Sequence, residues 1–159
     1  MCSRKSNFTE DGEIMDNKYE ALRLCNQLCF PLYAASKEII RRYKPVLDEL
    51  ELTYTQYITM MVMWEHGSMS VKDMGKVLYL DSGTLTPVLK KLEQKGFITR
   101  KRDSADERVL VVTVTDEGMA LRDRALDVPA KIACTLELSP EEAIMLAGIL
   151  RKIIGEQED

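Results

Sequence analysis

Apolar residues recur every three or four positions along most of the chain, and this spacing predicts a mainly helical protein. The first long helix is expected from about Asn17 to Tyr43. Pro31 lies within it and should bend the helix beside Cys29, because proline removes one amide donor. The pair Lys44-Pro45 should then end this helix or turn the chain.

The same spacing predicts helices in the last third of the chain and before its centre. One runs from about Thr55 to His66, and a later one runs from Thr115 to about Cys134, with Pro129 as a kink or break. The final helix, Pro140 to Ile154, follows a start signal at Ser139. Its apolar stripe exceeds what a small domain needs, so the helices at both ends are expected to pair with a second copy, giving a two-fold homodimer.

A helix-turn-helix followed by a β-hairpin wing is predicted between these helices. A short amphipathic helix, Val71 to Leu78, precedes a second helix, and two runs with strand character, Phe97 to Arg102 and Val109 to Val114, follow it across a polar turn. Local start and stop signals support this order: Ser70 before the first helix, Asp81 or Ser82 before the second, and Gly96 after it.

The second helix of this motif has the features of a DNA-reading helix. Its apolar residues form one stripe, made of Leu85, Val88, Leu89 and Leu92. In a helix-turn-helix the second helix enters the major groove and presents its N-terminal residues to base edges. Pro87 lies close enough to the N-terminus to be tolerated. We therefore expect DNA contacts from Ser82, Thr84, Thr86, Pro87, Lys90 and Lys91.

The charge distribution supports a nucleic-acid partner although the net charge of the chain is −4. The segment from Lys90 to Arg108 holds seven basic and four acidic residues, Arg100 among the basic ones, whereas Glu137 to Asp159 holds six acidic and two basic residues. A basic patch on an acidic chain is typical of a protein whose charge is directed at one DNA-binding surface.

Composition and the first residues limit the number of domains and the cellular compartment that we expect. A chain of 159 residues with 45% hydrophobic residues is long enough for one domain. We expect a flexible tail over residues 1–16 and a single domain over 17–159, with dimerisation helices in 17–45 and 116–159 and the winged helix-turn-helix in 55–115. The first sixteen residues lack an apolar run, so we expect a cytoplasmic protein without a membrane partner, whose four cysteines are reduced at rest.

Several short motifs together resemble the MarR family of winged helix-turn-helix regulators. They are Trp64, the segment Leu78 to Pro87 (LYLDSGTLTP), Gly96 to Arg100, Asp106-Glu107-Arg108, and Val114 to Gly118. Leu28-Cys29-Phe30 with Leu32-Tyr33-Ala34 is similar to the branch of organic-hydroperoxide repressors. The resemblance covers the chain from about Leu24 onward, and relatives commonly carry a plain apolar residue where this chain has Pro31.

The resemblance implies roles for individual residues. Cys29 matches the peroxide sensor, and Tyr43 and Tyr54 match tyrosines of the other subunit that hydrogen-bond its sulfur. Tyr33 lies one helical turn from Cys29. Arg108 matches the wing-tip arginine that enters the minor groove of double-stranded operator DNA, and Asp106 the residue that orients it. No cofactor is implied.

The chemistry expected of Cys29 is thiol oxidation. Phenol donors or a helix dipole stabilise a thiolate, which attacks an organic hydroperoxide and becomes a sulfenic acid. Relatives of the two-cysteine type then form a disulfide with a thiol in a later helix of the partner subunit, and Cys134 occupies that place. Such a bridge would shift the recognition helices and release the repressor from DNA.

Alternatives stay open at this point. A lone cysteine on an apolar face is more often part of a core, and Cys134 could be a small core residue. Cys25 is a rival partner for Cys29, although two cysteines on one helix strain a disulfide. A thiol peroxidase lacks a recognisable catalytic set here, and a metal site from Cys25, Cys29, Cys134 and His66 lacks ligand spacing. The runner-up is a MarR-type repressor released by a phenolic or other small apolar effector.

Overall fold

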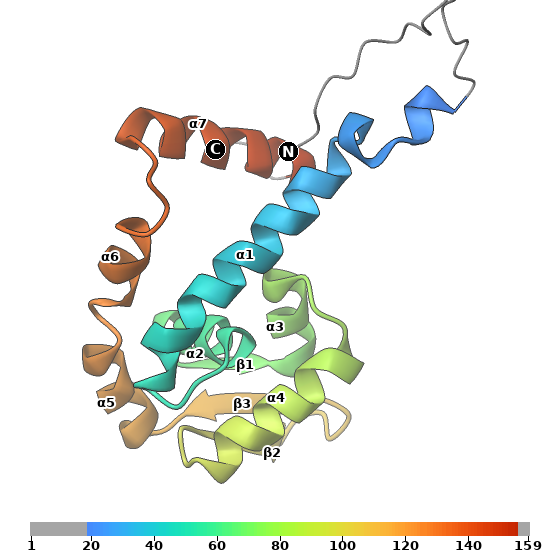
Figure 1. Ribbon diagram of the computed structural model, residues 1–159. Coiled ribbons are helices and arrows are strands. Elements are labelled where there is room, and N and C mark those ends of the chain that lie inside the picture. Colours follow the sequence, from blue (N-terminus) through green and yellow to red (C-terminus); the bar gives the residue numbers. More distant parts are fainter. Residues whose placement is uncertain (1–18, 156–159) are drawn as a thin grey trace, which may run out of the picture. The chain divides into compact units, whose positions relative to one another are not determined.

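The computed structural model describes residues 19–155, and the chain divides into two units at the junction between Arg41 and Arg42 (Figure 1). The described part of the first unit begins with two single 3-10 turns, η1 (Glu20–Leu22) and η2 (Leu24–Asn26). Helix α1 (Cys29–Asp48) starts in this unit and ends in the second one. No described helix is both long and apolar enough to cross a bilayer.

Helix α1 begins and ends later than its apolar spacing predicts. Pro31 is only its third residue, where a backbone amide has no acceptor within the helix, so the ring removes no hydrogen bond. The predicted bend beside Cys29 is therefore wrong. Pro45 lies inside the helix instead of ending it. The part of the first predicted helix that precedes Tyr19 lies outside the described residues.

The second unit contains the predicted helix-turn-helix. Helix α2 (Tyr54–His66) precedes α3 (Val71–Leu78) and α4 (Ser82–Gln94), and all three begin at side-chain caps. The cap of α2 is a capping box formed by Thr53 and Gln56, so the helix begins at Tyr54, one residue before the start expected from the sequence. Tyr79 takes a left-handed conformation between α3 and α4, which turns the chain sharply into the recognition helix.

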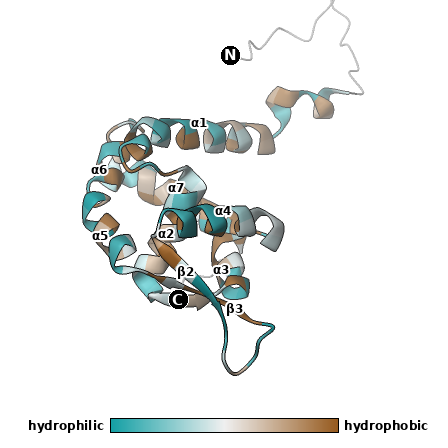
Figure 2. Ribbon diagram, turned by 90° about the horizontal axis from the view of Figure 1, so that it is seen from below, coloured by the Kyte–Doolittle hydropathy of each residue, from teal (hydrophilic) through white to brown (hydrophobic). Residues whose placement is uncertain are grey.

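A three-stranded antiparallel sheet accompanies these helices. Strands β2 (Ile98–Arg102) and β3 (Leu110–Val114) form the predicted wing, and the short strand β1 (Ser68–Ser70), which sequence reasoning missed, pairs with the other edge of β3. Figure 2 shows that β2 is apolar where it begins and hydrophilic towards the turn. Ile98 at the start of β2 and Val112 in the middle of β3 join the core, whereas Arg108 at the tip of the wing is left to water.

The helix expected over 115–134, with Pro129 as a kink or break, is broken into two. Helix α5 (Asp116–Arg124) ends first, and α6 (Val128–Ala133) starts with Pro129 in its first turn, where proline is tolerated. Helix α7 (Pro140–Ile154) has the predicted capping box at Ser139. None of its residues is buried within the chain.

The core of the second unit lies where α2, α4 and the sheet meet α5 and α6. Its most deeply buried apolar side chains are those of Leu47, Met60, Met63, Met74, Leu85, Leu89, Leu92, Ile98 and Val112. Gly118 at the start of α5 lies against the carbonyl of Phe97, and its own carbonyl accepts a hydrogen bond of 2.7 Å from Trp64 Nε1. These contacts attach the root of the wing to α2 and α5.

Candidate nucleic-acid interface and thiol site

The recognition helix α4 is started by Asp81. One carboxylate oxygen of Asp81 accepts from the Thr84 amide at 2.8 Å, and the other accepts from the Thr84 hydroxyl at 3.0 Å. The backbone hydrogen bond from Thr84 is the largest cause of the lowered pKa of Asp81. Ser82, Thr84 and Thr86 are all exposed around this first turn and a half. The predicted base-reading residues thus lie together on the surface.

The wing tip holds Arg108 in a defined position. Its Nε donates to Asp106 Oδ1 at 3.0 Å and its Nη2 donates to Oδ2 at 3.1 Å, while the side chain stays 91% exposed. These hydrogen bonds from the Arg108 side chain lower the pKa of Asp106 and raise that of Arg108. Asp103 accepts from the amides of Ala105 and Asp106 and so fixes the turn that carries the pair. The Arg108 guanidinium therefore projects into solvent in an orientation that Asp106 fixes.

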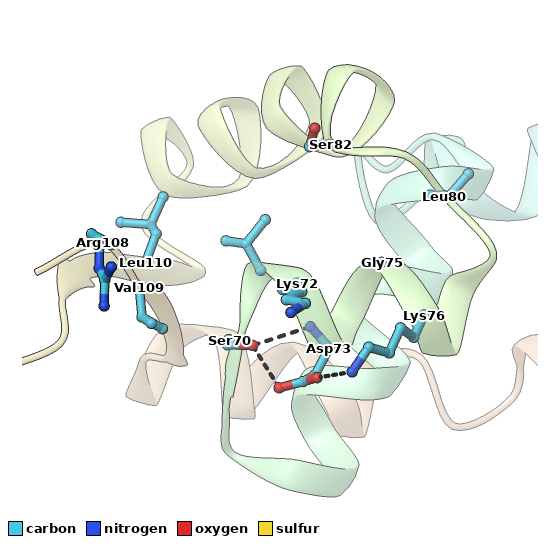
Figure 3. Close-up of a pocket in the computed structure, with 11 residues that line it drawn as sticks. Ser70, Lys72, Asp73, Gly75, Lys76, Leu80, Ser82, Arg108, Val109 and Leu110 are labelled. Atoms are coloured by element: carbon cyan, nitrogen blue, oxygen red, sulfur yellow. Dashed lines mark hydrogen bonds and ion pairs between the residues drawn. The ribbon is translucent and has the colours of Figure 1, made fainter. Parts of the chain in front are cut away.

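A groove of about 750 Å³ separates the wing from the helix-turn-helix (Figure 3). Ser82 lines it from α4, Arg108 from the wing, and Ser70 and Lys72 from the start of α3. Lys76 Nζ is paired with Asp73 at 2.7 Å, whereas Lys72 is exposed at the groove. Lys72 was not singled out from the sequence, because neighbouring charges on one short helix do not indicate which of them faces a groove.

Arg100 lies in a different environment from the other candidate DNA contacts. Its side chain is only 20% exposed and donates to Glu93 Oε2 from Nε at 3.0 Å and from Nη2 at 2.6 Å. The hydrogen bond from Arg100 lowers the pKa of Glu93. The pair joins α4 to β2, while Lys90 and Lys91 remain exposed on α4. Arg100 therefore connects the recognition helix with the wing.

The described cysteines, Cys25, Cys29 and Cys134, are free and exposed. Cys29 is the first residue of α1, and Tyr33 follows one turn later with Lys37 Nζ 5.7 Å from its ring centroid. Cys25 belongs to η2, and Gln27 is extended between the two thiols. The expectation that Cys25 and Cys29 share one helix is therefore wrong, and helical geometry does not prevent their bridging.

Cys134 lies at the C-terminal end of α6. Its amide donates to the Ala130 carbonyl at 3.2 Å, and its side chain is exposed while Ile132 takes the buried position on the same helix. The interpretation of Cys134 as a small residue buried in the chain's own core is therefore wrong. Cys2 lies outside the described residues.

Tyr43 and Tyr54 belong to an aromatic cluster in the second unit. Their ring centroids are 4.9 Å apart, and Tyr57, which sequence reasoning missed, lies 5.9 Å from Tyr43 and 6.2 Å from Trp64. Burial is the main cause of the raised pKa of Tyr43, Tyr54 and Tyr57. Among residues 19–155, neither the Tyr43 nor the Tyr54 hydroxyl has a hydrogen-bonding partner. Both remain protonated donors at neutral pH.

The helix-turn-helix, the exposed start of α4 and the wing with a projecting arginine define the winged-helix class of transcriptional regulators. The model of a family described as transcriptional regulator SarA/Rot matches residues 41–124. The organic hydroperoxide resistance transcriptional regulator of Bacillus subtilis (strain 168) is 46% identical over 140 residues, which cover 88% of this chain and 95% of the relative.

Two solved structures of AbfR, a protein of Staphylococcus epidermidis, are also similar. Reduced AbfR bound to DNA has a TM-score of 0.71 and 33% identity and covers 87% of this chain and 96% of its own. AbfR in its disulfide form has a TM-score of 0.59 and 35% identity, with coverages of 86% and 96%. The chain belongs to the MarR family, in the branch of organic hydroperoxide resistance regulators. The resemblance to this family and branch and the fold class expected from the sequence are confirmed, whereas the two-cysteine type stays a prediction.

Proposed function

We propose that the chain is a redox-sensing repressor, which binds double-stranded operator DNA as a homodimer when reduced and leaves it when an organic hydroperoxide oxidises Cys29. The observation that carries the proposal is the exposed thiol at the first residue of α1, in a chain that also has an exposed recognition helix and an oriented wing-tip arginine. The 46% identity with a regulator named for organic hydroperoxide resistance supports an organic hydroperoxide as the oxidising signal.

DNA binding would use three surfaces of the second unit. Helix α4 enters the major groove with Ser82, Thr84 and Thr86 foremost, and Arg108 enters the minor groove, whose negative potential attracts a guanidinium. The groove between them, with Lys72 at its edge, suits the intervening sugar-phosphate backbone. The solved structure of reduced AbfR bound to DNA, a protein 33% identical to this chain, supports this use of the three surfaces.

A homodimer would be formed by the terminal helices of the single domain proposed over 17–159. Helix α7 carries Ile144, Met145, Ile149 and Ile153, each at least half exposed. An apolar surface of this kind on an otherwise charged helix is typical of an interface. Pairing of the 17–45 and 116–159 segments with their copies would place two recognition helices on two half-sites.

The switch would consist of two oxidation steps. The Cys29 sulfur attacks the peroxide, the O–O bond breaks, one oxygen remains on sulfur as sulfenic acid, and the other leaves as an alcohol that carries the thiol proton. The thiol of Cys134 from the partner subunit then attacks the sulfenic acid, forming the disulfide and releasing water. Tyr43 and Tyr54 of the partner subunit would support the first step as neutral donors to the sulfur.

Operator binding of the wild type and of Cys29→Ser, before and after addition of an organic hydroperoxide, tests the proposal. The wild type should be released and the variant should stay bound. Release of Cys29→Ser would favour the runner-up, a repressor released by a phenolic or other small apolar effector, for which the groove of about 750 Å³ offers space. A regulator of this kind consumes one peroxide per thiol without turnover, so we propose no enzymatic activity. We also propose a cytoplasmic location, because its proposed partner is operator DNA.

Peptide mapping after oxidation identifies the partner of Cys29. Trypsin leaves Cys25 and Cys29 in one peptide, Leu24 to Lys37, and Cys134 in another, Ile132 to Arg151. A bridge to Cys134 joins the two peptides and gives a covalent dimer on nonreducing electrophoresis, which Cys134→Ser should abolish. A bridge to Cys25 lowers the mass of the first peptide alone by two hydrogens, and it would replace Cys134 in the proposal.

A further inference from the structure

The turn that follows α1 is fixed by its own backbone. The Glu51 amide donates to the Asp48 carbonyl at 3.0 Å, and the Leu52 amide donates to the Leu47 carbonyl at 3.0 Å. Two such hydrogen bonds form the Schellman motif, in which the residue before the last donor is left-handed. Glu51 has this conformation, with a φ of 57°, and both leucines are buried in the core. Residues 49–52, called the 49–52 turn below, therefore set the direction in which α1 ends.

Three basic side chains from three later helices reach the 49–52 turn. Lys95, directly after α4, donates from Nζ to the Glu51 carbonyl. Arg124, the last residue of α5, donates from Nη2 to the Glu49 carbonyl at 3.1 Å. Lys131 on α6 pairs with the Glu49 carboxylate at 3.2 Å, and this ion pair is exposed, so it contributes little. Lys95 and Arg124 bind backbone oxygens, which move only when the turn itself moves.

The Lys95 side chain crosses a groove between the 49–52 turn and the end of α4. The groove has a volume of about 470 Å³ and is lined by Glu51 and Leu52 from the turn and by Lys91 and Lys95 from the other side. The Lys95 amide donates to the Lys91 carbonyl at 3.1 Å, so the backbone of Lys95 is bound to the last turn of α4. Because the groove leaves the two segments without close packing at this place, the Lys95 side chain is their direct connection there.

We propose that Lys95 and Arg124 are positioning residues of the redox switch, which make α4 and α5 follow a displacement of the 49–52 turn. Helix α1 has Cys29 as its first residue and continues for 20 residues to Asp48. A displacement of α1 after oxidation of Cys29 reaches α2 along the chain only through this turn. The turn carries the carbonyls that Lys95 and Arg124 bind, so α4 is displaced from its position on the operator. This inference rests on the proposed function and adds the residues that connect the thiol with the recognition helix.

Operator affinities of the reduced and the oxidised full-length protein test the inference. The readout is the ratio of the Kd after treatment with an organic hydroperoxide to the Kd before it, with equal loss of free thiol in every variant. Lys95→Met and Arg124→Met remove the charged donor and keep a long side chain. Each should lower this ratio by about threefold or more, an effect of the size found for residues that couple two sites. The oxidised variants would thus stay on DNA that the oxidised wild type leaves.

Two matched variants separate positioning from other roles. Glu51→Gly keeps the carbonyl that Lys95 binds and suits the left-handed backbone, so its ratio should equal that of the wild type. Lys90→Met removes a charge from the proposed DNA surface of α4 and should raise both Kd values by the same factor, which leaves the ratio unchanged. A general loss of stability would lower the Tm and likewise weaken both states without changing the ratio.

The outcomes distinguish this inference from the proposed function. An unchanged ratio in Lys95→Met and Arg124→Met, with a wild type that oxidation releases, would overturn the inference and leave the proposed function intact. A ratio that Glu51→Gly lowers as much as Lys95→Met does would also overturn it, because the carbonyl contact is kept in that variant. If the oxidised wild type binds the operator as tightly as the reduced one, the proposed function and this inference fail together.

Discussion

The joint between the wing and α5 is tested by Gly118→Ala. Gly118 is buried at the third position of α5, where its amide donates to Thr115 Oγ1 at 3.0 Å. A Cβ added to it would lie 2.1 Å from the Phe97 carbonyl oxygen and 2.8 Å from Val114 Cγ2. The first contact must lengthen by at least 0.9 Å to reach the 3.0 Å below which Cβ contacts essentially never occur.

The loss of stability expected of Gly118→Ala depends on which atoms the added methyl group meets. The oxygen belongs to the backbone, and it already accepts from the Thr115 amide at 3.1 Å, so a rotamer change cannot relieve the contact. Overpacking of a buried site costs about 1 to 3 kcal/mol, and we expect the upper end of that range. For a chain of this size about 3 kcal/mol corresponds to a loss of about 6 to 12 °C in Tm.

Thermal unfolding followed by circular dichroism measures this loss, with protein concentration fixed because dimer stability depends on it. Ala120→Ser, on the exposed side of the same helix, is the control and should shift Tm by less than about 2 °C. Operator affinity of Gly118→Ala should also fall, since the root of the wing must move. A Tm within about 2 °C of the wild type would refute the reasoning that the Phe97 carbonyl is fixed.

Three further changes test the site. Lys90→Ala should lower the slope of log affinity against log salt by about 1.8 per dimer, about 0.9 for each lost phosphate contact; an unchanged slope would remove Lys90 from the interface. Arg108→Ala should weaken operator binding, and equal affinity in a gel-shift titration would contradict the wing assignment. The hydrogen bond from Arg100 holds the pKa of Glu93 below its usual value, so this carboxylate stabilises the fold above about pH 4.5 and the stabilisation is lost as pH falls through the lower folded-state pKa. Glu93→Gln should flatten that acid loss in urea titrations at several pH values, and an unaltered pH profile would show that the pair contributes nothing.

A fourth change addresses the proposed sensor pocket. Tyr54→Phe removes one phenol donor and should slow the oxidation of Cys29 by an organic hydroperoxide, measured by loss of free thiol under excess peroxide. Operator binding of the reduced variant should not change, which separates this effect from damage to the fold. An unaltered oxidation rate would exclude Tyr54 from the sensor.

The helix-turn-helix could be predicted because its signals are local. The side chains of Ser70 and Asp81 each accept a hydrogen bond from the amide three residues later and so cap α3 and α4. Gly96 has the left-handed conformation expected after α4. Such signals depend on neighbours in sequence, so one chain segment suffices to identify them. The fold class and the order of the helices and of the two wing strands followed from them.

Features that depend on distant residues or on a single backbone angle were missed. Helical spacing continues through Leu22 and Cys25, but two extended residues, Arg23 and Gln27, interrupt the chain before α1, and periodicity does not detect them. Strand β1 has three residues, too few for an alternating pattern. Arg100 shares the face of buried Ile98 on β2, and the residue that pairs with its charge there, Glu93, lies on another element. These outcomes are decided by tertiary contacts, which local patterns do not encode.

The hydrogen bond between Trp64 and the Gly118 carbonyl gives the protein a built-in optical reporter. Trp64 is the only tryptophan of the chain, so all tryptophan emission arises where α2 meets α5 at the root of the wing. Tyr57, with its ring centroid 6.2 Å away, lies close enough to pass excitation energy to it. Fluorescence of the unlabelled protein can therefore follow, in real time, any rearrangement of this joint during oxidation or DNA release.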